Sequence, residues 1–297
     1  MFDKSKLTYG LTAFLDILGF GAQVLSVTPE EDLEGLLNDI RLIRKEFEHE
    51  PSDPSDQEIH LAYGKTVLAF SDSVIVNIPL VSRMVSISGE FDALGSELHS
   101  MALAQFICIE NALFLRGGVD LDWWYLDGTT LVSKSLANAY SLEGKACVPV
   151  IAVSNKLYSF LENNSGRRNY SPDIDPLLAN FRRFSGEVAG KTIDIRFLDY
   201  LSIVAGEIDW SATPAKLKFL ASLDDEQKDK QKWAWHQENL RTLFAVHART
   251  VEMAHSRCEE ASIQAKYLWL AEYHNEVASE FSIDDPSCFC AVEGISF

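Results

Sequence analysis

The stretch Phe14-Leu15-Asp16-Ile17-Leu18-Gly19-Phe20-Gly21 decides how we interpret this sequence. It ends a mostly apolar run, from Thr8 to Leu18, that is typical of a buried strand, so we expect the Asp16 carboxylate at a strand end. The two glycines allow a tight turn in which successive backbone N–H groups point at one place. The stretch predicts a metal-binding carboxylate beside a phosphate-binding turn, although an Asp in this setting is more often a turn or helix-capping residue.

A second aspartate has a similar setting in Ala69-Phe70-Ser71-Asp72-Ser73-Val74. We expect strands at 59–70 and 74–78, joined as a hairpin with Asp72 at its tip, where Asp is also ordinary turn chemistry. If Asp72 and Asp16 converge, they can hold two Mg²⁺ or Mn²⁺ ions about 3.5–4 Å apart, the arrangement for in-line displacement at phosphorus. The two carboxylates therefore predict a metal-dependent nucleotide enzyme, provided that they meet.

A cation for the phosphates is present in Arg116-Gly117-Gly118. A guanidinium at the start of a strand can bind phosphate oxygens with two parallel hydrogen bonds, and glycines allow close backbone approach. An Arg at a strand edge with glycines in a bulge explains the same residues equally well.

The composition excludes several classes of protein. The 297 residues are 47% apolar and 24% charged, as in an ordinary globular protein, and carry a formal charge of −18. This charge disfavours binding to nucleic acid and to anionic membranes. There is no apolar run of membrane-spanning length, and the five cysteines are scattered. Residues 1–6 lack the long apolar stretch of a signal peptide, so we expect none. We therefore expect a cytoplasmic protein with no disulfide framework.

The hydrophobic periodicity predicts an α+β fold, an α/β sandwich with helices on one side of a largely antiparallel sheet. Residues 8–155 form the expected catalytic domain, and residues 156–297 form a mainly helical C-terminal extension packed on it. The expected strands are 8–18, 59–70, 74–78, 114–120, 148–153 and a short one at 194–201. The expected helices are 29–48, 88–113, 132–142 and most of the chain after 214.

Four motifs in this order resemble the catalytic domain of class III nucleotidyl cyclases, the adenylate and guanylate cyclase family. They are Phe-x-Asp-Ile-x-Gly-Phe at 14–20, Ser-Asp-Ser-Val at 71–74, Leu-Arg-Gly-Gly-Val at 115–119 and Ala-Tyr-Ser-Leu-Glu at 139–143. The resemblance implies a ferredoxin-like sheet and a head-to-tail homodimer with its sites at the interface. It implies that Asp16, Asp72 and the Ile17 carbonyl hold both metal ions. It also implies that the Gly19, Phe20 and Gly21 amides, together with Arg116, receive the triphosphate.

The sequence departs from this family where the purine base and the transition state are bound. A Lys that reads the base corresponds to Leu68 here, and its Asp or Thr partner corresponds approximately to Thr130. The helix positions of the family's Asn and Arg align with Ala137 and Ser141. Asn138 lies one residue out of register, and Lys134 or Lys145 are candidates for the lost cation. Tyr63 is a candidate base contact, although a core tyrosine is the more common case, as is a buried or dimer-interface cluster for Trp123-Trp124-Tyr125.

The whole-chain pattern, with the C-terminal stretch 266–275, is similar to the bacterial Pycsar pyrimidine cyclases of phage defence. The resemblance implies conversion of UTP to 3′,5′-cyclic UMP and pyrophosphate, as a second messenger read by a separately encoded effector. A cytidylate cyclase that makes cyclic CMP from CTP is the close alternative. Two further alternatives are a catalytically inactive cyclase-like domain that binds a nucleotide as a sensor, and a structural interaction protein.

Overall fold

The computed structural model describes residues 3–48, 58, 62–88, 93–128, 130–164, 175 and 177–292. Its contacts divide the chain into two compact units, 1–200 and 201–297, and each is described by itself. No helix among the described residues has a stretch both long and apolar enough to span a membrane.

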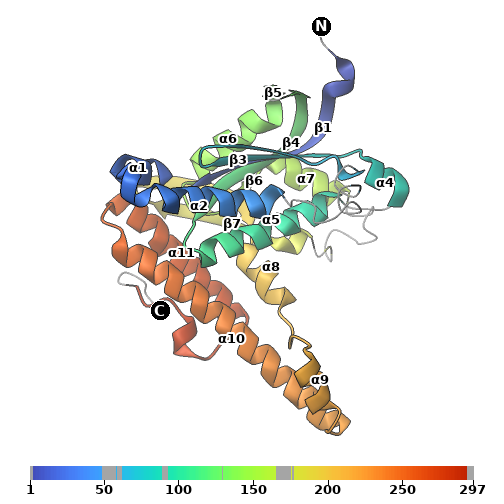
Figure 1. Ribbon diagram of the computed structural model, residues 1–297, viewed down its shortest axis with the longest axis vertical. Coiled ribbons are helices and arrows are strands. Elements are labelled where there is room, and N and C mark those ends of the chain that lie inside the picture. Colours follow the sequence, from blue (N-terminus) through green and yellow to red (C-terminus); the bar gives the residue numbers. More distant parts are fainter. Residues whose placement is uncertain are drawn as a thin grey trace. The chain divides into compact units, whose positions relative to one another are not determined.

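The first unit is built around a single β-sheet (Figure 1). Its strands are β1 (Leu7–Ile17), β2 (Thr66–Phe70), β3 (Ser73–Pro79), β4 (Leu115–Asp127), β5 (Thr130–Ser133), β6 (Ile151–Val153), β7 (Phe181–Val188) and β8 (Lys191–Leu198). The strand order is β2-β3-β1-β4-β6-β8-β7, and β5 pairs with β4. Among the described strands, β4 and β6 run parallel and the other pairs are antiparallel. The expected α+β class with a largely antiparallel sheet is confirmed.

Helices of the first unit cover both faces of this sheet. They are α1 (Phe20–Ser26), α2 (Pro29–Glu48), α4 (Arg83–Ser88), α5 (Ala93–Glu110), α6 (Lys134–Ala146) and α7 (Asn155–Asn163). The helices α2 and α5 pack on one face, and α6 packs on the other, directly over β4 and β1. We had expected helices on one side only, because the contact between α6 and the sheet depends on small residues that hydrophobic periodicity does not detect.

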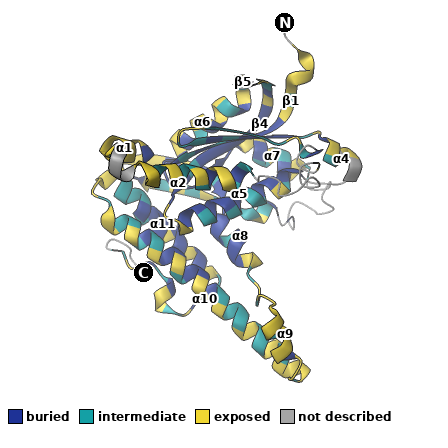
Figure 2. Ribbon diagram, in the orientation of Figure 1, coloured by how far each residue is buried: buried dark blue, intermediate teal, exposed yellow. Residues whose placement is uncertain are grey.

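Residues of β1 and β4 alternate between the two faces, as in any strand. Even-numbered residues face α6: the Thr12 Oγ1 atom lies 2.6 Å from Ser135 Oγ, and Asn138 donates to Asp120 over 2.8 Å. Odd-numbered residues such as Leu11 and Ala13 form the core, and they are fully buried. Figure 2 shows the dark blue of buried residues along much of β4. Asp16 therefore lies on the same sheet face as α6.

The second unit is helical and contains two long helices that pack on each other. Its helices are α8 (Tyr200–Glu207), α9 (Pro214–Leu220), α10 (Asp225–Arg257) and α11 (Ala261–Glu280). Between α10 and α11, the buried His247 and His274 rings lie with their Nδ1 atoms 2.9 Å apart. His274 Nε2 lies 2.7 Å from the Cys288 carbonyl oxygen, which ties down the segment after α11. A short 3₁₀ helix lies at Pro286–Cys288 in this unit, and two others lie at Lys4–Lys6 and Leu178–Asn180 in the first unit.

Several predicted elements differ from the structure. The strand expected at 59–70 is β2, which begins only at Thr66. Tyr63 is helical, and Gly64 follows it with a φ of 69°. Residues 59–61 lie outside the described residues. Short apolar runs are ambiguous between strand and helix, which explains the error at Tyr63.

The hairpin of β7 and β8 was only partly expected, since the prediction had one short strand at 194–201. Its two-residue turn is Ala189-Gly190, with φ values of 52° and 73°. This geometry fits a hairpin turn that usually carries Asn-Gly or Asp-Gly, so the sequence has no strong turn signal there. The sheet consequently extends into residues that we expected in the C-terminal extension.

Candidate active site

One row of side chains crosses the sheet at the carboxyl end of β1. The ladder pairs Asp16 with Arg116 on β4, and on the other side Asp16 lies next to Ser73 of β3. Arg116 donates to Asp16 Oδ2 from Nη2 over 2.9 Å and from Nε over 3.3 Å, and Ser73 Oγ donates to Asp16 Oδ1 over 3.3 Å. Two of the predicted site residues, Asp16 and Arg116, are therefore in direct contact.

Asp72 completes this group from the turn between β2 and β3. The turn is tight, and Ser71 has a φ of 55°. Burial raises the pKa of Asp16 to about 6. Hydrogen bonds from Arg116 lower it, and the nearby Asp72 carboxyl raises it. A cation shared by two neighbouring carboxylates offsets the repulsion between them.

These residues fit a site for divalent cations. Among the described residues no group of three or more His, Cys, Asp or Glu side chains is placed to hold a metal ion, so the candidate ligands here are the two aspartates. Mg²⁺ is commonly held in this way, by one or two carboxylates together with water and substrate phosphates. The Leu18 amide donates to Phe114, so the alternation of the ladder turns the Ile17 carbonyl away from β4 and towards β3. Asp16, Asp72 and the Ile17 carbonyl thus lie at one end of the sheet.

The turn at Gly19–Gly21 follows Asp16 closely in the sequence. Gly19 adopts a left-handed conformation (φ 82°, ψ 1°) that favours glycine, and α1 starts at the next residue. The Phe20 side chain is buried and fixes the start of α1, whereas a Cβ at Gly21 would meet no atom within 4 Å. The amides of the first helical turn have no partner within the helix. Gly19, Phe20 and Gly21 therefore offer N–H donors close to Asp16.

A residue that we had assigned no role, Glu143 of α6, reaches the same row. Its Oε1 atom lies 2.7 Å from Arg116 Nε. The Arg116 Nε–H is directed at Asp16 instead, so Glu143 Oε1 has no hydrogen-bond partner among the described residues. This oxygen is nevertheless shielded from water, because the Glu143 side chain is only 7% exposed. Helix α6 comes this close because residue 118 is glycine: a Cβ there would lie 2.2 Å from the Ala139 carbonyl oxygen.

The predicted base contacts lie apart from this row. Leu68 on β2 is half-buried, and the ladders place it in the next row of the same face, with Ile75 and Phe14. Tyr140 of α6 stacks edge-on against Phe14, with ring centroids 5.2 Å apart, and is 62% exposed. Tyr63 lies in a helical turn before β2. The row next to the carboxylates is therefore apolar.

The transition-state candidates Lys134 and Asn138 lie farther along the same face, away from Asp16, and the base-partner candidate Thr130 also lies away from it. Lys134 contacts Asp122 Oδ2 over 3.1 Å, and Asn138 contacts Asp120. Asp122 is six residues along β4 from Arg116, which corresponds to roughly 20 Å at about 3.3 Å per residue. Thr130 pairs with Asp127, farther still along β4. A single chain does not bring these three residues to Asp16.

The remaining helix positions singled out in the sequence, Lys145, Ala137 and Ser141, are exposed on α6. Lys156, which was not among the predicted residues, donates to Asp122 over 2.6 Å. Burial by itself raises the pKa of Asp122, but hydrogen bonds from Lys156, the Trp123 amide and Lys134 lower it to about 2.

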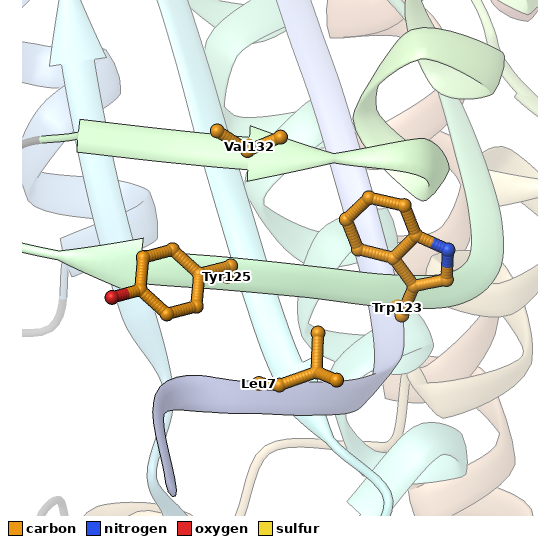
Figure 3. A pocket seen from close by; sticks show the side chains of 4 residues that line it. All are labelled: Leu7, Trp123, Tyr125 and Val132. Atoms are coloured by element: carbon orange, nitrogen blue, oxygen red, sulfur yellow. The ribbon is translucent and has the colours of Figure 1, made fainter. Parts of the chain in front are cut away.

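The aromatic cluster at 123–125 does not face the carboxylates. Trp123 and Tyr125 lie on the odd-numbered face of β4 and form an apolar recess with Leu7 and Val132 (Figure 3). Trp124 is buried on the other face. A base bound beside Asp16 cannot stack on Trp123 or Tyr125 of the same chain, because both the face and the strand end are different.

No protein-family model and no curated protein matches this sequence. Solved structures with some similarity include three cyclases. The catalytic core of a rhodopsin-guanylyl cyclase with converted specificity, in complex with ATPαS, is 14% identical with a TM-score of 0.39. The monomeric guanylyl cyclase domain of the RhoGC fusion protein from the aquatic fungus Blastocladiella emersonii is 13% identical with a TM-score of 0.39. Both matches cover 65% of this chain and 96% of the other. A bacterial light-regulated adenylyl cyclase is 15% identical with a TM-score of 0.33, covering 65% of this chain and 91% of the other. At this level of similarity, the function has to be inferred from the side chains described above.

Proposed function

We propose that this protein is a nucleotidyl cyclase that converts UTP to 3′,5′-cyclic UMP and pyrophosphate. The observation that carries the proposal is the convergence of Asp16, Asp72 and Arg116 at one strand end, beside the glycine turn. These residues come from three separate stretches of the sequence. Their meeting supplies what a triphosphate needs, which is a place for divalent cations, a guanidinium and backbone N–H donors.

Each group has a defined part in this reaction. Mg²⁺ or Mn²⁺ held by Asp16, Asp72 and the Ile17 carbonyl would acidify the ribose 3′-hydroxyl and offset charge on the phosphates. Arg116 and the amides of Gly19–Gly21 bind the β- and γ-phosphates and keep the leaving group in line with the attacking oxygen.

The bond changes balance without another reactant. The ribose 3′-oxygen forms a bond to the α-phosphorus as the bond from that phosphorus to the β-bridging oxygen breaks. Pyrophosphate leaves with the electron pair of that bond, and the hydroxyl proton goes to solvent.

The apolar row beside the carboxylates supports a pyrimidine substrate. Leu68, Ile75 and Phe14 occupy it, so among the described residues it offers no charged or amide side chain that could read the edge of a purine base. A smaller base demands fewer such contacts. The same row does not choose between uracil and cytosine, and cyclic CMP from CTP is the second product to be tested.

A head-to-tail homodimer is part of the proposal. On the same sheet face, Lys134 contacts Asp122, six residues of β4 from Arg116 and so roughly 20 Å away at about 3.3 Å per residue. Asn138 contacts Asp120, four residues from Arg116 and so roughly 13 Å away. Two copies facing each other in opposite directions would bring each copy's lysine end to its partner's carboxylate end. Dimerisation therefore offers a route by which Lys134 or Asn138 reaches the α-phosphate. The role in phage defence, with a separate effector, rests on the sequence resemblance alone.

The test is product analysis with pure full-length protein. It is incubated with each of the four nucleoside triphosphates and Mn²⁺, and cyclic products are identified by mass spectrometry. We expect cyclic UMP, and its loss in Asp16→Asn and Asp72→Asn, with unchanged circular dichroism. The matched control is Asp225→Asn, which removes the same charge from an aspartate that is 97% exposed on α10. Turnover that persists in both site variants would refute the proposal. Nucleotide binding without any product would instead support the inactive sensor.

A further inference from the structure

Arg116 has two carboxylates within reach and is hydrogen-bonded to one of them. Its Nη2 and Nε atoms donate to Asp16, and Glu143 Oε1 lies 2.7 Å from Nε with no hydrogen directed at it. The Arg116 side chain is 28% exposed, whereas the Asp16 and Glu143 side chains are 15% and 7% exposed. A buried carboxylate oxygen without a hydrogen bond is costly, so its position next to a guanidinium calls for an explanation.

We propose that Glu143 is a positioning residue that provides Arg116 with a second binding position, so that Asp16 can exchange Arg116 for a divalent cation. This inference rests on the proposed function insofar as Asp16 is a cation ligand. In the first position, seen here, Arg116 occupies Asp16 Oδ2. In the second, Arg116 turns its Nε–H to Glu143 and leaves the Asp16 oxygens to the cation.

The physical reason is the free energy of releasing Arg116. If Glu143 were absent, a cation that displaced Arg116 from Asp16 would leave a partly buried guanidinium without an anionic partner, which is unfavourable. With Glu143 at 2.7 Å, a small rotation of the side chain restores a charge-assisted hydrogen bond. The Glu143 carboxylate also compensates the positive charge of Arg116 beside the incoming cation. Both effects favour cation binding.

The second position also keeps Arg116 in the site. Phosphate oxygens that approach from the glycine turn then meet a guanidinium whose Nε is held by Glu143 and whose terminal nitrogens are free of Asp16. Glu143 is placed for this by α6, which Gly118 allows to pack tightly on β4. The motif Ala-Tyr-Ser-Leu-Glu thus acts at the carboxylate end of the same chain through its last residue.

The test is Mn²⁺ binding to the full-length protein without nucleotide, measured by calorimetry. We expect Glu143→Gln, which keeps the shape and removes the charge, to weaken Mn²⁺ binding by about tenfold. The matched control is Glu97→Gln. Glu97 forms a similar buried pair with Lys65, at 2.6 Å and 8% exposure, on the other side of the sheet. The Glu97→Gln variant should have a lower melting temperature and an unchanged affinity for Mn²⁺.

A second measurement follows the arginine itself. In ¹⁵N–¹H spectra, the Arg116 Nε–H signal, assigned by its loss in Arg116→Lys, should shift on Mg²⁺ addition and remain sharp in the wild type. In Glu143→Gln, it should broaden on Mg²⁺ addition. Unchanged Mn²⁺ affinity in Glu143→Gln, or an Arg116 signal that Mg²⁺ does not move, would overturn the proposal. Neither measurement uses nucleotide, so a protein that binds Mn²⁺ as expected but makes no cyclic product would refute the cyclase and leave the role of Glu143 standing.

Discussion

The close approach of α6 to β4 makes Gly118→Ala a sensitive perturbation. A Cβ at residue 118 would lie 2.2 Å from the Ala139 carbonyl oxygen and 2.7 Å from Leu142 Cβ, whereas ordinary contacts start at 3.4 Å. Because the first of these atoms is backbone, the whole helix has to move, by about 1 Å. Overpacking of this kind costs about 1–3 kcal/mol. For a unit of this size, 2 kcal/mol lowers the melting temperature by about 4–8 °C.

The assay is thermal unfolding followed by circular dichroism, with Gly144→Ala as the control on the same helix. A Cβ at Gly144 would meet no atom within 4 Å, and alanine is the better helix former. We therefore expect Gly144→Ala to stabilise the protein by about 0.5–1 kcal/mol, in the opposite direction to Gly118→Ala. If the two variants change the melting temperature equally, the tight contact of α6 with β4 is refuted.

The same substitution also tests how the helix serves the site. Glu143 lies on the face of α6 that meets the sheet, so a displaced helix lengthens the 2.7 Å separation between Glu143 and Arg116. Gly118→Ala should therefore destabilise the fold and also weaken Mn²⁺ binding, measured at temperatures well below the unfolding transition of the variant. If Gly118→Ala is destabilised but binds Mn²⁺ with full affinity, the position of Arg116 does not depend on the tight packing of α6.

Two further predictions concern the second unit. Burial lowers the pKa of His274 to about 4 and that of His247 well below its usual value, so both rings are neutral when folded and bind protons more readily when unfolded. The stabilisation that the two neutral rings give the folded state is complete above pH 6.5 and is lost as the pH falls towards 4. For His274 alone, the free energy of unfolding falls by about 3 kcal/mol over this range. Urea unfolding at several pH values measures this, and a flat profile would contradict it. Asp224 and Gln227 form a capping box at the start of α10, and Asp224→Ala should cost about 1 kcal/mol in the same assay, whereas an unchanged midpoint would argue against the cap.

Much of the site could be predicted because its residues follow strong local signals. An apolar run that ends in Asp16 and a hairpin that carries Asp72 both fix a carboxylate by the position of a strand end. Arg116 lies beside Asp16 because β4 pairs with β1 over its whole length. The sequence motifs place these three residues at strand ends, and the ladder alone brings them together.

Other features could not be predicted because they depend on packing between distant elements. Glu143 has the sequence setting of an ordinary helix residue, and its role follows only from how closely α6 crosses Gly118. The helical turn at Tyr63 and the Ala189-Gly190 hairpin were missed because neither carries the usual local signal. Periodicity detects which face of an element is apolar, and it does not measure how near two elements come.

The electrostatics of the α6 face explain why the departures from the cyclase pattern do not by themselves imply an inactive protein. One end of the face has the two carboxyl groups of Asp16 and Asp72, and the other end has Lys134 and Lys156, both bound to the buried Asp122. In a single chain the two ends are too far apart to compensate each other, since charges separated by more than about 8–10 Å are largely screened at physiological salt. Two copies arranged head to tail would place each cationic end opposite an anionic one. An Asn and an Arg at fixed helix positions are one way to supply donors to the α-phosphate, and lysines brought by the partner are chemically equivalent in charge, though not in geometry.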